Sequence, residues 1–299
     1  MAKWMLAAAA LALWTGYAGA QLRPLAIPYQ LTYSYNLDGV PSPDARSMVF
    51  IRIVEGREQL FLRALDGAGE RQITRGAADH EDPAWSPDGS RLAFIRIEGG
   101  AKRVMVARAD GGGAEAVTPP EQHAIHPAWT PDGKAILYCT DDDLRPPAKN
   151  ASEIYSIDLA SRRVTTLISG GVNTFPVMSP DGRRIAFRRI LGEMNSEVFV
   201  ADADGRNARN LTNDPAFDGW PAWAPDGRTI AFAANRRANY QIFLMDADGG
   251  NVRLLANTEG RATSPKWAPD GRTVYFTNCR KIDYGAGCEV MAASLGAGR

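Results

Sequence analysis

The chain has 299 residues with 34 basic and 34 acidic side chains, so its formal net charge at pH 7 is zero. Apolar residues make up 45% of the sequence and charged residues 23%, a balance typical of a folded globular protein and not of a disordered one. The neutral total argues against a nucleic-acid partner, which needs a concentrated excess of Lys and Arg. The 29 glycines and 19 prolines indicate many tight turns.

Residues 1–20 have the order of a secretory signal peptide. Lys3 gives a positive start, residues 5–14 are almost wholly apolar, and small residues precede Gln21. We expect cleavage between Ala20 and Gln21, with no lipid attachment because no Cys follows that position. The apolar run is too short to span a bilayer, and no other segment is long and apolar enough to do so. The mature protein is therefore expected in the periplasm or secreted, without membrane insertion.

The rest of the chain is built from an internal repeat. The sequence Pro-Ala-Trp-Ser-Pro-Asp-Gly begins at Pro83, and similar segments begin at Pro127, Pro176, Pro221 and Pro265. A degraded copy lies at residues 42–45. The aspartates of the six copies are spaced by 44, 44, 49, 45 and 44 residues, and they are Asp44, Asp88, Asp132, Asp181, Asp226 and Asp270. A period of this length indicates a repeat architecture.

Each repeat predicts four short strands. The Pro-Asp-Gly segment is turn chemistry, and apolar runs such as 92–95, 104–106 and 242–245 follow it between further Asp-Gly turns. The repeated aspartates are therefore expected to be turn residues. The Trp series, Trp85, Trp129, Trp223 and Trp267, is expected to fill the space between blades.

These patterns predict an all-β fold, a six-bladed β-propeller with four-stranded antiparallel blades. The expected domains are the signal peptide at 1–20 and one propeller at 21–299, with blades near 38–75, 80–119, 124–169, 173–213, 218–257 and 262–295. The sixth repeat lacks a fourth strand, whereas residues 28–34 carry the Leu-Thr ending of one. We therefore expect residues 28–34 to complete the last blade and close the ring. Because closure removes sheet edges, a monomer is expected.

The repeat resembles the propeller of the TolB family, periplasmic proteins of the Tol-Pal envelope system, over essentially all of residues 28–295. TolB proteins carry an α/β domain ahead of the propeller, whereas about twenty residues separate the expected cleavage site from the first Pro-Asp here. The resemblance implies a propeller fold and an envelope protein as partner, such as a peptidoglycan-associated lipoprotein. The repeat is also similar to the propeller of prolyl oligopeptidase-type peptidases, but no Gly-x-Ser-x-Gly nucleophile motif is present.

The candidate binding residues lie where the repeats differ, on the face that holds the entries to the first strands. The three histidines fall there, and the acidic and aromatic neighbours complete one set, His80, Asp82, His123, His126, Asp218 and Trp220. His80, Asp82, His123 and His126 are candidates for a divalent-metal site. The alternative is a polar channel rim with hydrogen-bonded histidines, and no cofactor is then required.

Basic residues are expected on the same face, at or near the ends of second strands, and they are Arg52, Arg96, Arg188 and Arg236. A mixed ring of charge around a central mouth suits a peptide, a protein loop or an acidic ligand. Ordinary solvated loop charge is the alternative.

Three cysteines are present in a chain expected to enter an oxidising compartment, which permits one disulfide. Cys279 and Cys288 are nine positions apart and are the candidate pair, the alternative being two unpaired buried thiols. Cys139 is expected to be a buried core residue.

Two functional classes follow. We favour a non-enzymatic, protein-binding propeller of the cell envelope, linked by resemblance to Tol-Pal-type envelope integrity. The alternative is a small-ligand-binding or metal-dependent hydrolytic propeller, similar to lactonases or esterases, with its site at the channel mouth. Without a metal, the sequence contains no nucleophile, base and orienting group at recognisable spacing.

Overall fold

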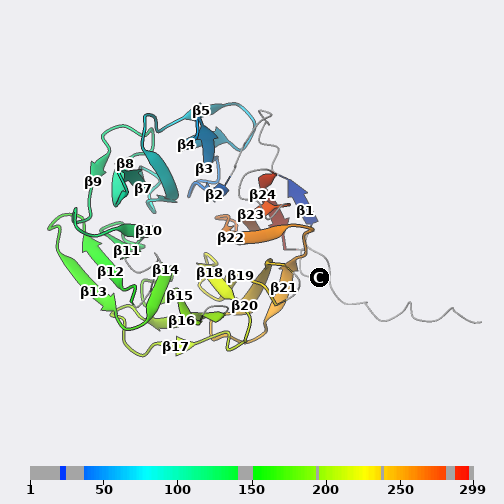
Figure 1. The fold of residues 1–299 in the computed structure, drawn as a ribbon. Helices are drawn as coiled ribbons and strands as arrows, with labels where there is room; N and C mark the ends of the chain where they lie inside the picture. Colours follow the sequence, from blue (N-terminus) through cyan, green and yellow to red (C-terminus); the bar gives the residue numbers. More distant parts are fainter. Residues whose placement is uncertain are drawn as a thin grey trace, which may run out of the picture.

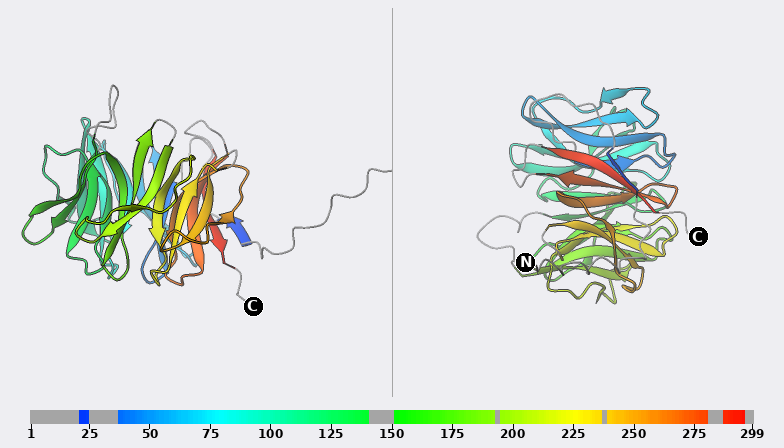
Figure 2. Two further views of the ribbon diagram at one scale, coloured as in Figure 1. Left: turned by 90° about the horizontal axis from the view of Figure 1, so that it is seen from below. Right: turned by 90° about the vertical axis from the view of Figure 1, so that its right-hand side faces the viewer.

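The computed structural model describes residues 21–24, 37–140, 151–192, 195–236, 239–280 and 287–295. The regular secondary structure of these residues is entirely β, in six four-stranded antiparallel sheets. The sheets are arranged as blades around a centre, and the side views show them standing next to one another in a single layer (Figures 1 and 2). The expected six-bladed β-propeller is confirmed. The expected signal peptide lies outside the described residues.

The chain enters each of the first five blades at its innermost strand and leaves at its outermost one. Blade one holds β2 (Leu37–Pro41), β3 (Ser47–Val54), β4 (Arg57–Ala64) and β5 (Glu70–Gln72). Blade two holds β6 (Asp79–Trp85), β7 (Arg91–Glu98), β8 (Ala101–Arg108) and β9 (Glu115–Ala116). Blade three holds β10 (Ala124–Trp129), β11 (Ala135–Thr140), β12 (Ile154–Asp158) and β13 (Val164–Ile168).

The second half of the ring repeats this order. Blade four holds β14 (Val172–Met178), β15 (Arg184–Gly192), β16 (Asn195–Asp202) and β17 (Arg209–Asn210). Blade five holds β18 (Asp218–Trp223), β19 (Thr229–Ala234), β20 (Gln241–Asp246) and β21 (Arg253–Ala256). Blade six holds β22 (Arg261–Trp267), β23 (Thr273–Cys279), β24 (Cys288–Ser294) and, from the other end of the chain, β1 (Gln21–Pro24). No helix in the described part of the chain is long and apolar enough to cross a membrane.

The Pro-Asp-Gly segments form the turns between first and second strands. In blade two, the hydroxyl of Ser86 donates to Oδ1 of Asp88 at 2.6 Å, and the backbone N–H of Ser90 donates to the same oxygen at 3.1 Å. Gly89 follows with φ of 71°, a left-handed conformation that glycine adopts without steric cost. The hydrogen bonds from Ser86 and Ser90 lower the pKa of Asp88 to about 2. The motif aspartate is thus a turn residue, as its sequence context predicts.

The core is divided into six clusters, one between each pair of neighbouring blades. Each cluster contains one buried aromatic residue from a second strand, at the sixth position after the motif aspartate. These residues are Phe50, Phe94, Tyr138, Phe187, Phe232 and Phe276. Truncating a buried Phe to Ala typically costs about 3–5 kcal/mol, so the interfaces between blades account for much of the stability.

The repeated tryptophans tie each blade to the one before it. The indole N–H of Trp85 donates to the carbonyl of Val40 at 3.1 Å, and that of Trp129 donates to the carbonyl of Ala84 at 3.1 Å. Trp223 and Trp267 make the same bond across their interfaces. The tryptophans therefore fill space between blades and also satisfy their polar atom there.

The two ends of the chain meet in blade six. Strand β1 pairs antiparallel with β24, Gln21 opposite Ser294 and Pro24 opposite Met291. The fourth strand of this blade is therefore residues 21–24, not the expected 28–34, which lie outside the described residues. The Leu-Thr ending was a weak guide, because a strand bonded only along its inner edge places few demands on its side chains. Cys279 and Cys288 face each other across β23 and β24 and are joined by a disulfide.

Candidate functional site

The innermost strand of every blade carries a β-bulge at the same place. In β6, for example, Glu81 pairs with Ile95 and Ala84 with Ala93, so three steps on the inner strand oppose two on its partner. The extra residue has a positive φ in all six blades, between 49° and 54°. In ring order these six residues, here called the bulge ring, are Asp38, Asp82, His126, Phe175, Trp220 and Ser264.

The bulge ring is strained. A left-handed conformation brings Cβ close to the following carbonyl oxygen, which costs roughly 1–2 kcal/mol for an L-residue, and it is unusual for a bulky one such as Phe175 or Trp220. Five of the six residues also precede the motif proline, which further restricts their backbone. Residues in such conformations cluster at binding and catalytic sites, where the surrounding structure holds them in place.

All six members of the bulge ring line one central cavity of about 500 Å³. The motif prolines and tryptophans form the rest of its wall, together with Lys266. The volume is within the range of sites that hold a small ligand or a few side chains of a partner. Each blade contributes one member of the bulge ring, and these members differ in charge and size. The chemical character of the cavity wall therefore differs from blade to blade.

Blades one and two give the cavity an acidic side. Burial, together with the nearby carboxyl groups of Asp38 and Glu81, raises the pKa of Asp82 to about 8, whereas Lys266 acts in the opposite direction. Burial also raises the pKa of Glu81 to about 8, reinforced by the neighbouring Glu58 carboxyl with which it shares a hydrogen bond. At neutral pH this side therefore holds carboxyl groups that are largely protonated and that gain charge if a cation approaches.

Blades four and five give the cavity an aromatic side. The ring centroids of Phe175 and Trp220 are 5.5 Å apart, and Tyr240 meets Trp220 edge-on at 5.7 Å. The guanidinium of Arg188 lies behind them, 4.8 Å from the centroid of Phe175 and 5.4 Å from that of Trp220. Burial lowers the pKa of Arg188 to about 10, which leaves it charged at neutral pH. A buried cation thus supports the rings from the side away from the cavity.

His126 contacts both the acidic side and the aromatic side of the cavity. Its Nε2 is 3.7 Å from Oδ2 of Asp82, and its ring stacks on Phe175 with centroids 3.6 Å apart. Burial, with the positive charge of Arg188 next in size, lowers the pKa of His126 well below its ordinary value. The ring is therefore neutral at neutral pH, and its contact with the largely protonated Asp82 is not an ion pair.

Behind His126 lies a thiol that has the neighbours of a catalytic nucleophile. Nδ1 of His126 is 3.2 Å from Sγ of Cys139, so Cys139, His126 and Asp82 form a row. Cys139 has no exposed surface, however, and burial raises its pKa to about 12. Since the thiolate is the nucleophile and His126 stands between the sulfur and the cavity, this row does not support covalent catalysis.

The expected site residues do not form one group. Asp82, His126 and Trp220 line the central cavity, but His80 and Arg96 line a separate cavity between blades one and two. His123 lies before β10 and does not line either cavity. The alternation of a strand would place His80 and Asp82 on one side, but the bulge at Asp82 breaks that alternation.

The expected arginines also have separate roles. Arg236 donates to both carboxylate oxygens of Asp218, at 3.1 and 2.6 Å, in a pair within blade five. Arg52 forms an ion pair with Glu70 in blade one. The expectation of one charged ring around the mouth is therefore wrong, because these side chains find partners within or between blades.

Three members of the bulge ring, Asp38, Phe175 and Ser264, are absent from the set expected from sequence. The signal that could have found them is positional, since each stands where Asp82 stands in its own repeat. In the part of the chain that the structure describes, no group of three or more His, Cys, Asp or Glu side chains is placed to hold a metal ion. The expected metal candidates are separated, because His80 lines the cavity between blades one and two and His123 lines neither cavity.

The fold and the cavity define a six-bladed propeller with a central cavity. The family model of the TolB beta propeller domain matches residues 35–167 and 147–294, and the chain belongs to this family. The Tol-Pal system protein TolB of Anaeromyxobacter dehalogenans is 51% identical over 47 residues, which are 16% of this chain and 11% of that protein. The chain thus spans only a small part of the curated relatives that it matches.

Solved structures agree on the fold. TolB from Acinetobacter baumannii has a TM-score of 0.66 at 22% identity, covering 89% of this chain and 64% of that one. An oligogalacturonate lyase from Vibrio parahaemolyticus has a TM-score of 0.60 at 12% identity, covering 92% of this chain and 93% of that one. Identities this low show the architecture alone, and that architecture occurs both in a TolB and in a lyase.

Proposed function

We propose that this chain is an exported, non-enzymatic propeller of the cell envelope that binds a protein partner in its central cavity. The bulge ring carries the proposal, because every blade holds a strained, non-glycine residue at the wall of the same cavity. Glycine would relieve this strain, so retaining six side chains there points to a binding role. The family and the Tol-Pal name of a relative support the envelope setting.

The cavity suits a partner segment with an apolar or aromatic side chain followed by a polar or basic group. The rings of Phe175 and Trp220 offer an apolar surface with well-defined geometry, and aromatic residues of this kind dominate binding energy at protein interfaces. Asp38 and Asp82 on the opposite side offer acceptors for amide or cationic donors. We propose a peptidoglycan-associated lipoprotein, or a related envelope protein, as the source of that segment.

The hydrolytic alternative takes second place. A likeness in fold to a lyase is an argument by architecture only, since one fold serves many chemistries. At the site itself, the one row that resembles catalytic machinery ends in a thiol that is buried and protonated. The binding proposal needs no reactive group, because the wall of the cavity provides both apolar and polar contacts.

The test is the affinity of the mature protein for a purified peptidoglycan-associated lipoprotein, without its lipid, from the same organism. Trp220→Gly removes the indole while relieving backbone strain at φ of 53°, and Leu191→Ala, which shortens an exposed apolar side chain outside the cavity, is the matched control. Loss of an aromatic anchor of about 2 kcal/mol corresponds to a roughly thirty-fold weaker Kd by calorimetry. Equal affinity of both variants and wild type would place the partner elsewhere, and no binding by wild type would reject this partner.

Export is tested separately. The protein is expressed in its own organism, recovered from the periplasmic fraction, and its N-terminus is sequenced. We expect Gln21 as the first residue. A protein that retains residues 1–20, or that is recovered only with the cytoplasm, would contradict the envelope location.

A further inference from the structure

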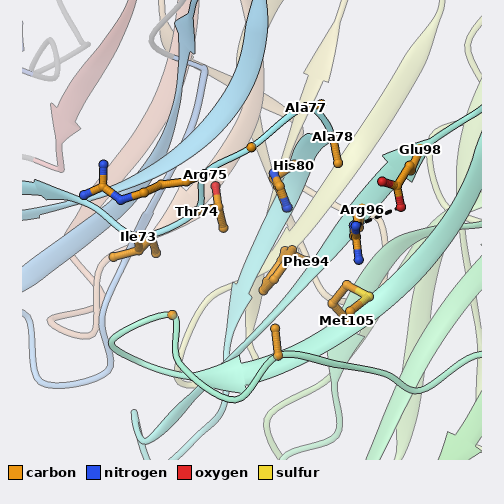
Figure 3. Close-up of a pocket in the computed structure, with 13 residues that line it drawn as sticks. Ile73, Thr74, Arg75, Ala77, Ala78, His80, Phe94, Arg96, Glu98 and Met105 are labelled. Carbon is orange, nitrogen blue, oxygen red and sulfur yellow. Dashed lines mark ion pairs between the residues drawn. The ribbon is translucent and has the colours of Figure 1, made fainter.

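A second cavity lies between blades one and two, away from the central cavity. It has a volume of about 340 Å³. One wall is the connection 73–78 that leads from β5 to β6, and the other wall consists of side chains from one face of blade two (Figure 3). These side chains include His80, Phe94, Arg96 and Met105. The cavity therefore combines apolar side chains with His80 and Arg96, and the carboxylate of Glu98, which pairs with Arg96, also lines it.

His80 is the unusual residue of this cavity. Its side chain belongs to a residue with only 6% of its surface exposed, yet its Nδ1 is buried without a hydrogen-bond partner among the described residues. A buried polar atom without a partner typically costs about 1–3 kcal/mol. Burial lowers the pKa of His80, and the positive charge of Arg96 lowers it further, whereas Asp79 acts in the opposite direction. The site thus destabilises a charged imidazole when no anion is nearby.

In blade five, the residue at the position of His80 has its hydrogen bonds. Asp218 stands three residues before the motif proline of blade five, as His80 does in blade two. Asp218 has no exposed surface and accepts two hydrogen bonds from Arg236. In blade five, a buried carboxylate and an arginine of the same blade therefore complete each other.

In blade two, His80 stands in the place of this carboxylate and Glu98 in the place of the arginine. His80 pairs in register with Arg96 across β6 and β7, which places both side chains on the same face of the sheet. Arg96 instead forms an ion pair with Glu98 at 2.8 Å, with 42% and 63% of the two side chains exposed. Exposed pairs of this kind contribute little, so Arg96 can exchange this partner for a better one at small cost.

We propose that the cavity between blades one and two binds a small organic carboxylate. Its carboxylate group lies between Arg96 and Nδ1 of His80, and its short apolar chain lies against Phe94 and Met105. A charge-assisted, two-point contact of this kind with an arginine is the strong form of carboxylate recognition.

The test uses hexanoate as the probe and the imidazole resonances of the mature protein as the readout. The chain has only three histidines, so single His→Ala variants assign each signal. We expect hexanoate to shift the His80 resonance saturably, with a Kd on the order of 1 mM, and to leave those of His123 unchanged. Hexanamide, which has the same shape without the charge, is expected to leave the His80 resonance in place.

Two variants make the test specific. Arg96→Gln should weaken hexanoate binding at least about ten-fold, the value of one lost charge-assisted contact, whereas the matched Arg206→Gln should not. Arg206 is also an exposed arginine paired with an acid two residues away, but it lies outside the cavity. His80→Asp should abolish binding, because it removes the imidazole and places a carboxylate opposite Arg96.

Other outcomes would overturn the proposal. These are a shift that never saturates, an equal shift with hexanamide, or equal affinity of the Arg96→Gln and Arg206→Gln variants. A second arm replaces hexanoate by N-acetyl-leucine, which has the same terminal carboxylate on a peptide-like chain. Tighter binding of N-acetyl-leucine would identify a peptide C-terminus as the source of the carboxylate, and tighter binding of hexanoate a free fatty-acid-like molecule.

Discussion

The strain in the bulge ring predicts an unusual pattern of stability at two neighbouring residues of blade six. Ser264 belongs to the bulge ring, with φ of 54°, whereas the preceding Thr263 is not among the residues with positive φ. Both lie in β22, both are partly buried, and neither side chain makes a described hydrogen bond. Substitutions at these two positions therefore separate backbone strain from the loss of contacts.

Replacing Ser264 by Gly removes a Cβ that costs roughly 1–2 kcal/mol in the left-handed conformation. Glycine also increases the conformational entropy of the unfolded chain, which lowers the gain in stability by roughly 0.5–1 kcal/mol. We therefore expect Ser264→Gly to stabilise the protein by about 0.5–1 kcal/mol and Ser264→Val to destabilise it by at least about 1 kcal/mol. At Thr263 the order reverses, with Gly costing about 0.5–1 kcal/mol and Val nearly neutral.

Urea unfolding of the four variants and the wild type, followed by circular dichroism, measures these differences. A change of 1 kcal/mol corresponds to a shift in Tm of about 2–4 °C for a protein of this size, so thermal melts provide a second measurement. If glycine destabilised the protein equally at both positions, the left-handed backbone at Ser264 would carry no strain. The positive φ values of the bulge ring would then not be evidence of strain around the central cavity.

Three further results are expected. Because burial raises the pKa of Glu81 to about 8, the folded state binds more protons than the unfolded state between about pH 4.5 and 8. The free energy of unfolding should fall as the pH rises through this window, and Glu81→Gln should flatten that slope in denaturant titrations at a series of pH values. Asp218→Ala should destabilise the fold by up to about 3–5 kcal/mol, because the largely buried Arg236 loses its two hydrogen bonds to Asp218 and keeps the more distant Asp214, at 3.6 Å; adding Arg236→Met should restore part of this loss. Deleting residues 21–34 removes β1 and leaves the outer edge of β24 unpaired, so a lower Tm and aggregation in size-exclusion chromatography are expected; an unchanged, monomeric protein would show that β1 is dispensable.

The repeat made the architecture predictable. Its turn chemistry is local, since Asp88 bonds only to residues two positions away, and the same local pattern recurs in the other repeats. The packing of Trp85 and Phe94 is nearly as local, because each blade contacts only its neighbours in the ring. The number of blades then follows from counting copies of the motif.

The site was harder to predict, because it depends on contacts between distant repeats. Asp38 and Phe175 are 137 positions apart and meet the same cavity only once the ring is closed. The bulge that redirects Asp82 away from His80 has no sequence signal beyond the proline that follows it. The chain end that completes blade six was misplaced for a similar reason, since a four-residue strand has too little pattern to fix its register.

The amino-acid sequence by itself determined the propeller class, the number of blades, the family and the structural role of the motif residues, because each of these depends on short-range chemistry repeated at a constant spacing. Tertiary structure decided which variable residues share a cavity, which charges are paired, and which polar atoms are left buried without a partner. His80 and Asp218 show the difference: they occupy the same position in their repeats, but Asp218 is paired with Arg236 of its own blade, whereas Nδ1 of His80 is buried without a partner among the described residues.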